Sequence, residues 1–119
     1  MFIVTNSFHD LPFIQHAECG YLRADPALTF CRVRFARSQL QDALFSQYAI
    51  PLPPSLTGAV AKRKAEYLAG RYCARYLLQQ SGCFEPVLTA TDRAPIWPAG
   101  WRGSVSHSED IAIAVVSAD

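Results

Sequence analysis

The chain has 119 residues, half of them hydrophobic and 18% charged, with a formal net charge of +1 at pH 7. This length suits one domain or one half of a larger one, and the composition allows a buried core and excludes global disorder. A net charge so close to zero gives no support to bulk attraction by nucleic acid or by an anionic membrane.

No stretch of the sequence predicts a leader or a membrane-spanning segment. Residues 1–5 lack the basic start and the long apolar run of a signal peptide. No run approaches the roughly 20 apolar residues that span a bilayer, so no transmembrane segment is expected. We therefore expect a cytoplasmic protein.

The cysteines predict no metal site. Cys19, Cys31, Cys73 and Cys83 have no Cys-x-x-Cys spacing and do not cluster with the histidines, so a zinc site is not expected. Their apolar sequence context suits buried free thiols in a reducing compartment.

The first half of the chain gives few periodic signals. Residues 1–28 show no clear period. Residues 30–35 alternate apolar with basic side chains, which predicts a half-buried strand. Residues 38–48 have apolar residues at helical spacing, with Ser38 as a candidate N-cap. Prolines within residues 51–54 then predict a rigid connector.

The strongest signal predicts a helix from Val60 to Gln80. Its apolar residues fall on one stripe of a 3.6-residue helix, and Ser81-Gly82 ends it because glycine tolerates a left-handed turn. The stripe consists of Ala61, Ala65, Leu68, Ala69, Tyr72, Cys73, Tyr76 and Leu77.

The end of the chain predicts further strands and a turn. The strands are expected at residues 84–89, 104–106 and 111–117, and the turn at residues 91–93. The whole pattern predicts an α+β fold, with one long helix packed on a small, mainly antiparallel sheet.

The polar face of the predicted helix carries two arginines with two open interpretations. Arg63 lies roughly opposite the apolar stripe, and Arg71 lies about 12 Å along the axis from it at ~1.5 Å per residue. One interpretation is an ordinary solvated face, on which Glu66 could pair with Lys62 at i, i+4. The other is a basic wall that holds the phosphates of an extended ligand, a task suited to arginine's planar fork.

The pair Ser106-His107 closes a run rich in Trp, Pro and Gly. Adjacent residues on a strand point to opposite faces, and no Gly-x-Ser-x-Gly elbow is present, so a hydrolase is not supported. Phosphate contact suits the pair better, because hydroxyl, imidazole and backbone N–H groups all donate hydrogen bonds. His107 is interpreted as a ligand-binding residue, not as a base.

Other residues near this pair have two interpretations each. Trp97 and Trp101 either pack and anchor the loop, which is the favoured interpretation, or stack on an adenine. Glu109 and Asp110 are adjacent carboxylates, which are interpreted as surface charge because a magnesium site needs carboxylates that converge on one point.

Two motifs of this sequence form a joint pattern. One is Lys-Arg-Lys-Ala-Glu-Tyr-Leu-Ala-Gly-Arg at residues 62–71, and the other is Arg-Ala-Pro-Ile-Trp-Pro at residues 93–98, which continues through Gly-Ser-Val-Ser-His at residues 103–107. With the closing strand at residues 112–117, they resemble the phosphopantetheinyl transferases of the surfactin-synthetase-activating type. The branch they resemble most acts in enterobactin and related siderophore synthesis. The resemblance covers roughly residues 55 to 119.

The resemblance implies a fold and a set of ligand-binding residues. The family has two pseudo-symmetric α+β halves that bind coenzyme A and magnesium between them, and residues 1–119 look like the N-terminal half. By position, the two arginines and the Ser-His pair would contact phosphates, the turn from Thr89 to Asp92 would border the adenosine, and Arg93 would assist. The residues carried over are Arg63, Arg71, Thr89, Ala90, Thr91, Asp92, Arg93, Ser106 and His107.

The chain departs from the family at its end. The family continues into a Gly-(Ile/Val)-Asp-x-Glu segment that binds magnesium and a helix with a Glu and a Lys near the reaction centre, whereas this sequence ends at Asp119. The resemblance therefore implies transfer of 4'-phosphopantetheine from coenzyme A to a serine of an acyl or peptidyl carrier protein. It implies no catalytic residue and no metal ligand within residues 1–119, so these residues alone are expected to be inactive.

Two other functions remain open at this point. One is a non-catalytic domain that binds a nucleotide phosphate or a protein partner. The other is an interaction module that associates with itself through an apolar strand surface left by a missing half. The sequence does not distinguish which carrier protein or siderophore is involved.

Overall fold

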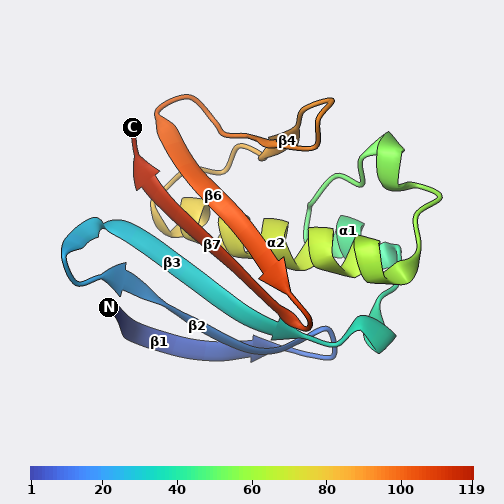
Figure 1. Ribbon diagram of the computed structural model, residues 1–119, viewed down its shortest axis with the longest axis horizontal. Helices are drawn as coiled ribbons and strands as arrows, with labels where there is room; N and C mark the ends of the chain where they lie inside the picture. Colours follow the sequence, from blue (N-terminus) through green and yellow to red (C-terminus); the bar gives the residue numbers. More distant parts are fainter.

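The computed structural model describes residues 1–119 and contains two layers, a sheet and the helices that cover one of its faces (Figure 1). Two 3-10 helices lie at Arg37–Gln39 and Pro54–Leu56. The other elements are β1 (Phe2–Asp10), β2 (Ile14–Leu22), β3 (Asp25–Phe35), α1 (Ala43–Gln47), α2 (Ala61–Gln80), β4 (Leu88–Thr89), β5 (Pro95–Ile96), β6 (Trp101–Ser108) and β7 (Ile111–Ala118). No helix of the structure has both the length and the apolar character needed to cross a membrane.

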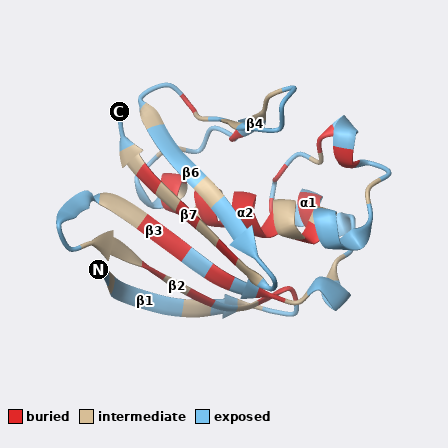
Figure 2. Ribbon diagram, viewed as in Figure 1, coloured by how far each residue is buried: buried red, intermediate tan, exposed pale blue.

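The main sheet has five strands in the order β1-β2-β3-β7-β6, and all neighbours are antiparallel. The chain between β3 and β7 includes α2, which packs on one face of the sheet, and β6, which pairs with β7. Cys31 lies opposite Ala114 and Val33 opposite Ala112, and all four are buried against α2 (Figure 2). The predicted α+β fold, with one long helix on a mainly antiparallel sheet, is confirmed.

The long helix matches its prediction closely. α2 begins at Ala61, one residue after the predicted start, because Val60 is its N-cap, and it ends at Gln80. Gly82 has a φ of 87°, a left-handed conformation that ends the helix without the steric cost a side chain would add. Most of the predicted stripe is buried or half-buried, and Ala61 is exposed.

Two predictions of local structure were wrong in extent. Residues 38–48 do not form one helix, because a 3-10 turn ends at Gln39, Ser38 caps nothing and α1 covers only Ala43–Gln47. The strand predicted at 84–89 shrinks to Leu88–Thr89, since Pro86 has no N–H to donate to a partner strand.

The apparently aperiodic residues 1–28 form two long strands and the start of a third. The pairing of β1 with β2 shifts register between Val4 and Asn6 and again between Phe8 and Asp10. Each shift moves later side chains to the opposite face, which erases the period-2 pattern from the sequence.

The cysteines are free, as predicted. Cys19, Cys31 and Cys73 are buried and Cys83 is half-buried. The neighbouring Cys31 thiol and burial both raise the pKa of Cys19, which favours its protonated, unreactive form.

Candidate functional site

A hollow of about 220 Å³ lies where α2, β6 and the β4–β5 hairpin meet. Four of its charged residues are cationic or can become so: Arg63 and Arg71 on α2, Arg93 in the hairpin turn and His107 on β6. The full lining is Pro53, Ser55, Leu56, Arg63, Glu66, Tyr67, Arg71, Thr89, Arg93, Pro95, Val105 and His107.

Arg71 is the most unusual of these residues. It is 5% exposed and is the only charged residue among the buried ones. No carboxylate pairs with it, and its Nε has no hydrogen-bond partner. A buried charge without a counter-ion is costly, so a guanidinium kept in this state on the wall of a hollow is typical of an anion-binding site.

Two neighbours hold Arg71 in place. Its guanidinium carbon lies 4.7 Å from the centre of the Tyr67 ring, within cation–π range. Its Nη2 donates to Oγ1 of Thr89 over 3.2 Å, and the Tyr67 hydroxyl lies 2.6 Å from the same Oγ1. The family resemblance implied that Thr89 borders the adenosine of the ligand, and the structure places its hydroxyl between these two side chains.

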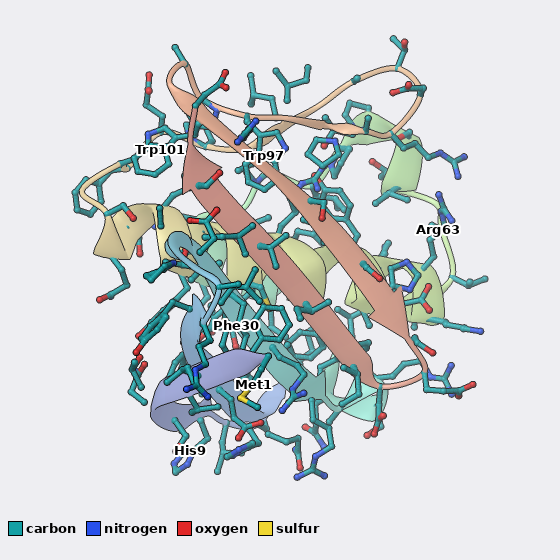
Figure 3. All side chains as sticks on the ribbon, turned by 60° about the vertical axis from the view of Figure 1, so that its left-hand side comes forward. Met1, His9, Phe30, Arg63, Trp97 and Trp101 are labelled. Carbon is teal, nitrogen blue, oxygen red and sulfur yellow. The ribbon has the colours of Figure 1, made fainter.

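The three basic residues at the start of α2 diverge. Arg63 is exposed and lines the hollow, near the N-terminal end of α2 (Figure 3). Lys64 pairs with Asp42 at 3.1 Å, and Lys62 lines a separate hollow. No acidic side chain occupies the first turn, so the positive end of the helix dipole remains unbalanced there.

The hairpin turn presents Arg93. The Ala94 N–H donates to Oδ1 of Asp92 over 3.0 Å, and the Arg93 N–H donates to the Ala90 carbonyl. Arg93 has a φ of 74°, which is uncommon for a residue with a side chain and is often found at functional sites. The predicted turn at residues 91–93 is confirmed.

The residues predicted to bind the ligand divide into two groups. Arg63, Arg71, Thr89, Arg93 and His107 line the hollow. Ala90, Thr91, Asp92 and Ser106 do not.

Ser106 is separated from His107 by the strand geometry. Val105 and His107 both line the hollow, so Ser106 between them points to the other face of the sheet, as alternation on a strand requires.

The tryptophans lie away from the hollow. Trp97 and Trp101 are half-buried against the core, beside the start of β6 and far from Arg63 (Figure 3). A Cβ at Gly103 would lie 3.0 Å from the Trp97 ring, so glycine there gives the ring room to pack. The packing interpretation therefore fits the structure better than stacking on a ligand.

Sequence reasoning missed Tyr67 and the role of Glu66. Tyr67 lies one turn from Arg63 and one turn from Arg71, a spacing that could have placed it between them. Under the solvated-face interpretation Glu66 could pair with Lys62, but its Oε2 lies 3.4 Å from Nδ1 of His107 on β6.

Comparison with known proteins assigns the family. The family model described as "4'-phosphopantetheinyl transferase N-terminal domain" matches residues 53–117, which include every charged residue of the hollow. The chain belongs to the 4'-phosphopantetheinyl transferase family.

Curated relatives of the chain support the same family assignment. Enterobactin synthase component D of Escherichia coli K12 is 38% identical over 107 residues, which cover 90% of this chain and 45% of that protein. Enterobactin synthase component D of Salmonella typhi is 41% identical over 68 residues, or 57% of this chain and 29% of that protein. The 4'-phosphopantetheinyl transferase PptT of Mycobacterium tuberculosis is 40% identical over 70 residues, or 56% of this chain and 31% of that protein. The chain thus spans less than half the length of these relatives.

Proposed function

We propose that residues 1–119 form the N-terminal subdomain of an enzyme that transfers 4'-phosphopantetheine from coenzyme A to a serine of an acyl or peptidyl carrier protein. In this proposal the subdomain supplies contacts to the phosphates and the adenosine of coenzyme A. The observation that carries it is the buried Arg71, without a counter-ion, on the wall of a hollow that also presents Arg63, Arg93 and His107.

The size of the hollow supports contact with one end of an extended ligand. Its volume of about 220 Å³ is below the roughly 300–1,000 Å³ of sites that enclose a drug-sized molecule. Coenzyme A carries a 3'-phosphate and a diphosphate, so several cations spread over α2, the hairpin and β6 suit its charge distribution.

The residues of the hollow do not fit a magnesium ion. Its only carboxylate, Glu66, lies beside His107, and magnesium in proteins is held by oxygen ligands, chiefly carboxylates and phosphates. No group of three or more His, Cys, Asp or Glu side chains that could hold a metal occurs in the chain. Magnesium in the complete enzyme would therefore depend on residues other than these.

The mechanism assigned to these residues is binding and orientation. Arg71, held by Tyr67 and Thr89, would donate charge-assisted hydrogen bonds to a phosphate without reorganising, and such preorganised donors favour the charged groups of phosphoryl transfer. Residues 1–119 alone are expected to bind coenzyme A weakly and to transfer nothing.

Calorimetric titration of the purified chain with coenzyme A tests the binding, and incubation with a carrier protein, coenzyme A and Mg²⁺ tests the activity. Saturable binding without carrier modification is the expected result. Absence of binding at millimolar coenzyme A would contradict the phosphate roles, and measurable carrier modification would contradict the expected inactivity.

A second candidate is self-association through the open face of the sheet. Ile111, Ile113 and Val115 of β7 are only half-buried there, because α1 and α2 lie on the opposite face (Figures 1 and 2). Sedimentation of the chain from about 1 to 100 μM should detect a dimer. The substitution Ile113→Thr should weaken the dimer without changing coenzyme A affinity.

A further inference from the structure

A carboxylate lies in the hollow that is otherwise built for anions. Glu66 faces the same space as Arg63, Tyr67 and Arg71 of its own helix, with Arg93 approaching from the hairpin turn. Its side chain is 15% exposed, and its Oε2 lies 3.4 Å from Nδ1 of His107. By charge alone Glu66 would repel a phosphate, so its place in the hollow requires another explanation.

The backbones fix this pairing. A Cβ at Gly70 would lie 2.5 Å from Cγ1 of Val105, so the missing side chain lets α2 and β6 come unusually close at this point. One helical turn back from Gly70 is Glu66, about 6 Å along the axis, and two residues on from Val105 is His107, about 6.6 Å along the strand. The two displacements from the point of close approach are nearly equal, so the side chains of Glu66 and His107 lie close to each other.

We propose that Glu66 is the positioning residue for His107. It accepts the Nδ1–H of the imidazole, which selects the Nδ1–H tautomer of the neutral ring. When the ring carries both protons, the same contact aims the Nε2–H at the anion in the hollow. The inference rests on the proposed function, because the anion is the phosphate of coenzyme A. Lys62 does not compete for Glu66, since it lines a separate hollow with Glu109 and Asp110.

The first test needs no ligand. Long-range ¹⁵N–¹H NMR of the full chain at pH about 8.5, where histidines are normally neutral, reports which ring nitrogen carries the proton. His107 should carry it on Nδ1, and this preference should be lost in Glu66→Ala. The exposed His9 and His16 serve as internal controls that should not change. A proton on Nε2 of His107 in the unaltered chain would overturn the proposal.

The second test is a double-mutant cycle on coenzyme A affinity with Glu66→Ala, His107→Ala and the double variant. With His107 present, Glu66→Ala should weaken binding by about 2-fold or more, the lower end of coupling between contacting residues. With His107 absent, the same change should leave affinity unchanged or strengthen it, because only repulsion is removed.

The outcomes separate the two proposals. If Glu66→Ala strengthened coenzyme A binding both with His107 present and in the His107→Ala variant, Glu66 would act only by repelling the ligand, and its positioning role would be refuted. Failure of the unaltered chain to bind coenzyme A would refute the proposed function, and the NMR result would still decide the pairing. Unchanged amide spectra outside the hollow would show that each variant is folded.

Discussion

Arg71 and Tyr67 lie one above the other on α2, with the guanidinium carbon 4.7 Å from the ring centre and both side chains bonded to Oγ1 of Thr89. This arrangement satisfies one nitrogen of a buried guanidinium and leaves Nε without a partner. The stability and the ligand affinity of the chain should therefore respond differently to changes at this point.

Replacement Arg71→Met should weaken coenzyme A binding by roughly tenfold, the range expected for losing hydrogen bonds from a charged donor. The melting temperature should stay level or rise, because a buried charge is exchanged for an apolar side chain of similar length. Calorimetry and thermal melting measure the two effects. Arg75→Met, one turn along the same helix and outside the hollow, is the matched control and should keep the affinity. Equal losses in both variants would contradict a specific role for Arg71.

Replacement Thr89→Val should remove the shared hydroxyl while keeping the shape of the side chain. The Tyr67 hydroxyl and Arg71 Nη2 would each lose a partner, which should lower the free energy of unfolding by roughly 1–3 kcal/mol. Urea denaturation measures this loss. Thr89→Ser keeps the hydroxyl and should retain most of the stability. If valine and serine proved equivalent, the hydroxyl would have no such role.

Replacement Gly70→Ala should push α2 and β6 apart. The added methyl would lie 2.5 Å from Cγ1 of Val105, and overpacking of this kind costs about 1–3 kcal/mol. The second substitution Val105→Ala should recover part of the loss in the double variant, as judged by thermal melting. A fully stable Gly70→Ala protein would show that the close approach is not required.

Alkaline pH should destabilise the chain through Tyr48, which is buried, and Tyr72, which is half-buried. Burial and the nearby Asp10 carboxylate raise the pKa of Tyr48 to about 12, and burial followed by a hydrogen bond to Asp10 raises the pKa of Tyr72 as well. Tyrosine in the unfolded chain titrates near about 10. Above that pH the unfolded state releases protons that the folded state keeps, so the free energy of unfolding falls as pH rises from about 10 to 12.

The variant Tyr48→Phe checks this pH dependence. The Tyr48 hydroxyl is buried and has no hydrogen-bond partner, so its removal should not lower stability at neutral pH. Between pH 10 and 12, urea denaturation should show a shallower decline than in the unaltered chain. An identical decline would assign the effect to other groups.

The parts of the fold that sequence predicted well are those fixed by local periodicity. α2 has twenty residues of consistent helical spacing, and β7 alternates with little interruption, so each was located within one or two residues. β1 and β2 were not recognised, because two register shifts break the alternation over a short length of chain.

The burial of Arg71 could not be derived from its helix alone. On the helix surface it lies outside the apolar stripe, which left a solvated face as a reasonable interpretation. Its surroundings come from residues distant in sequence: Thr89, which accepts a hydrogen bond from it, and Ile50 and Val87, which line a second, small hollow with it. The same holds for Glu66, whose partner lies 41 residues away, beyond the reach of any i, i+4 rule.

β6 is one of the two edge strands of the sheet, with β7 as its only neighbour, and it carries His107. A phosphate bound between α2 and this strand would hold the edge of the sheet against the helix. Ligand binding and the pairing of β6 with β7 would then be thermodynamically linked. Substitutions that fray β6 at its distant end, near Trp101, would lower affinity without touching the ligand, and ligand would in turn slow amide exchange along the whole strand.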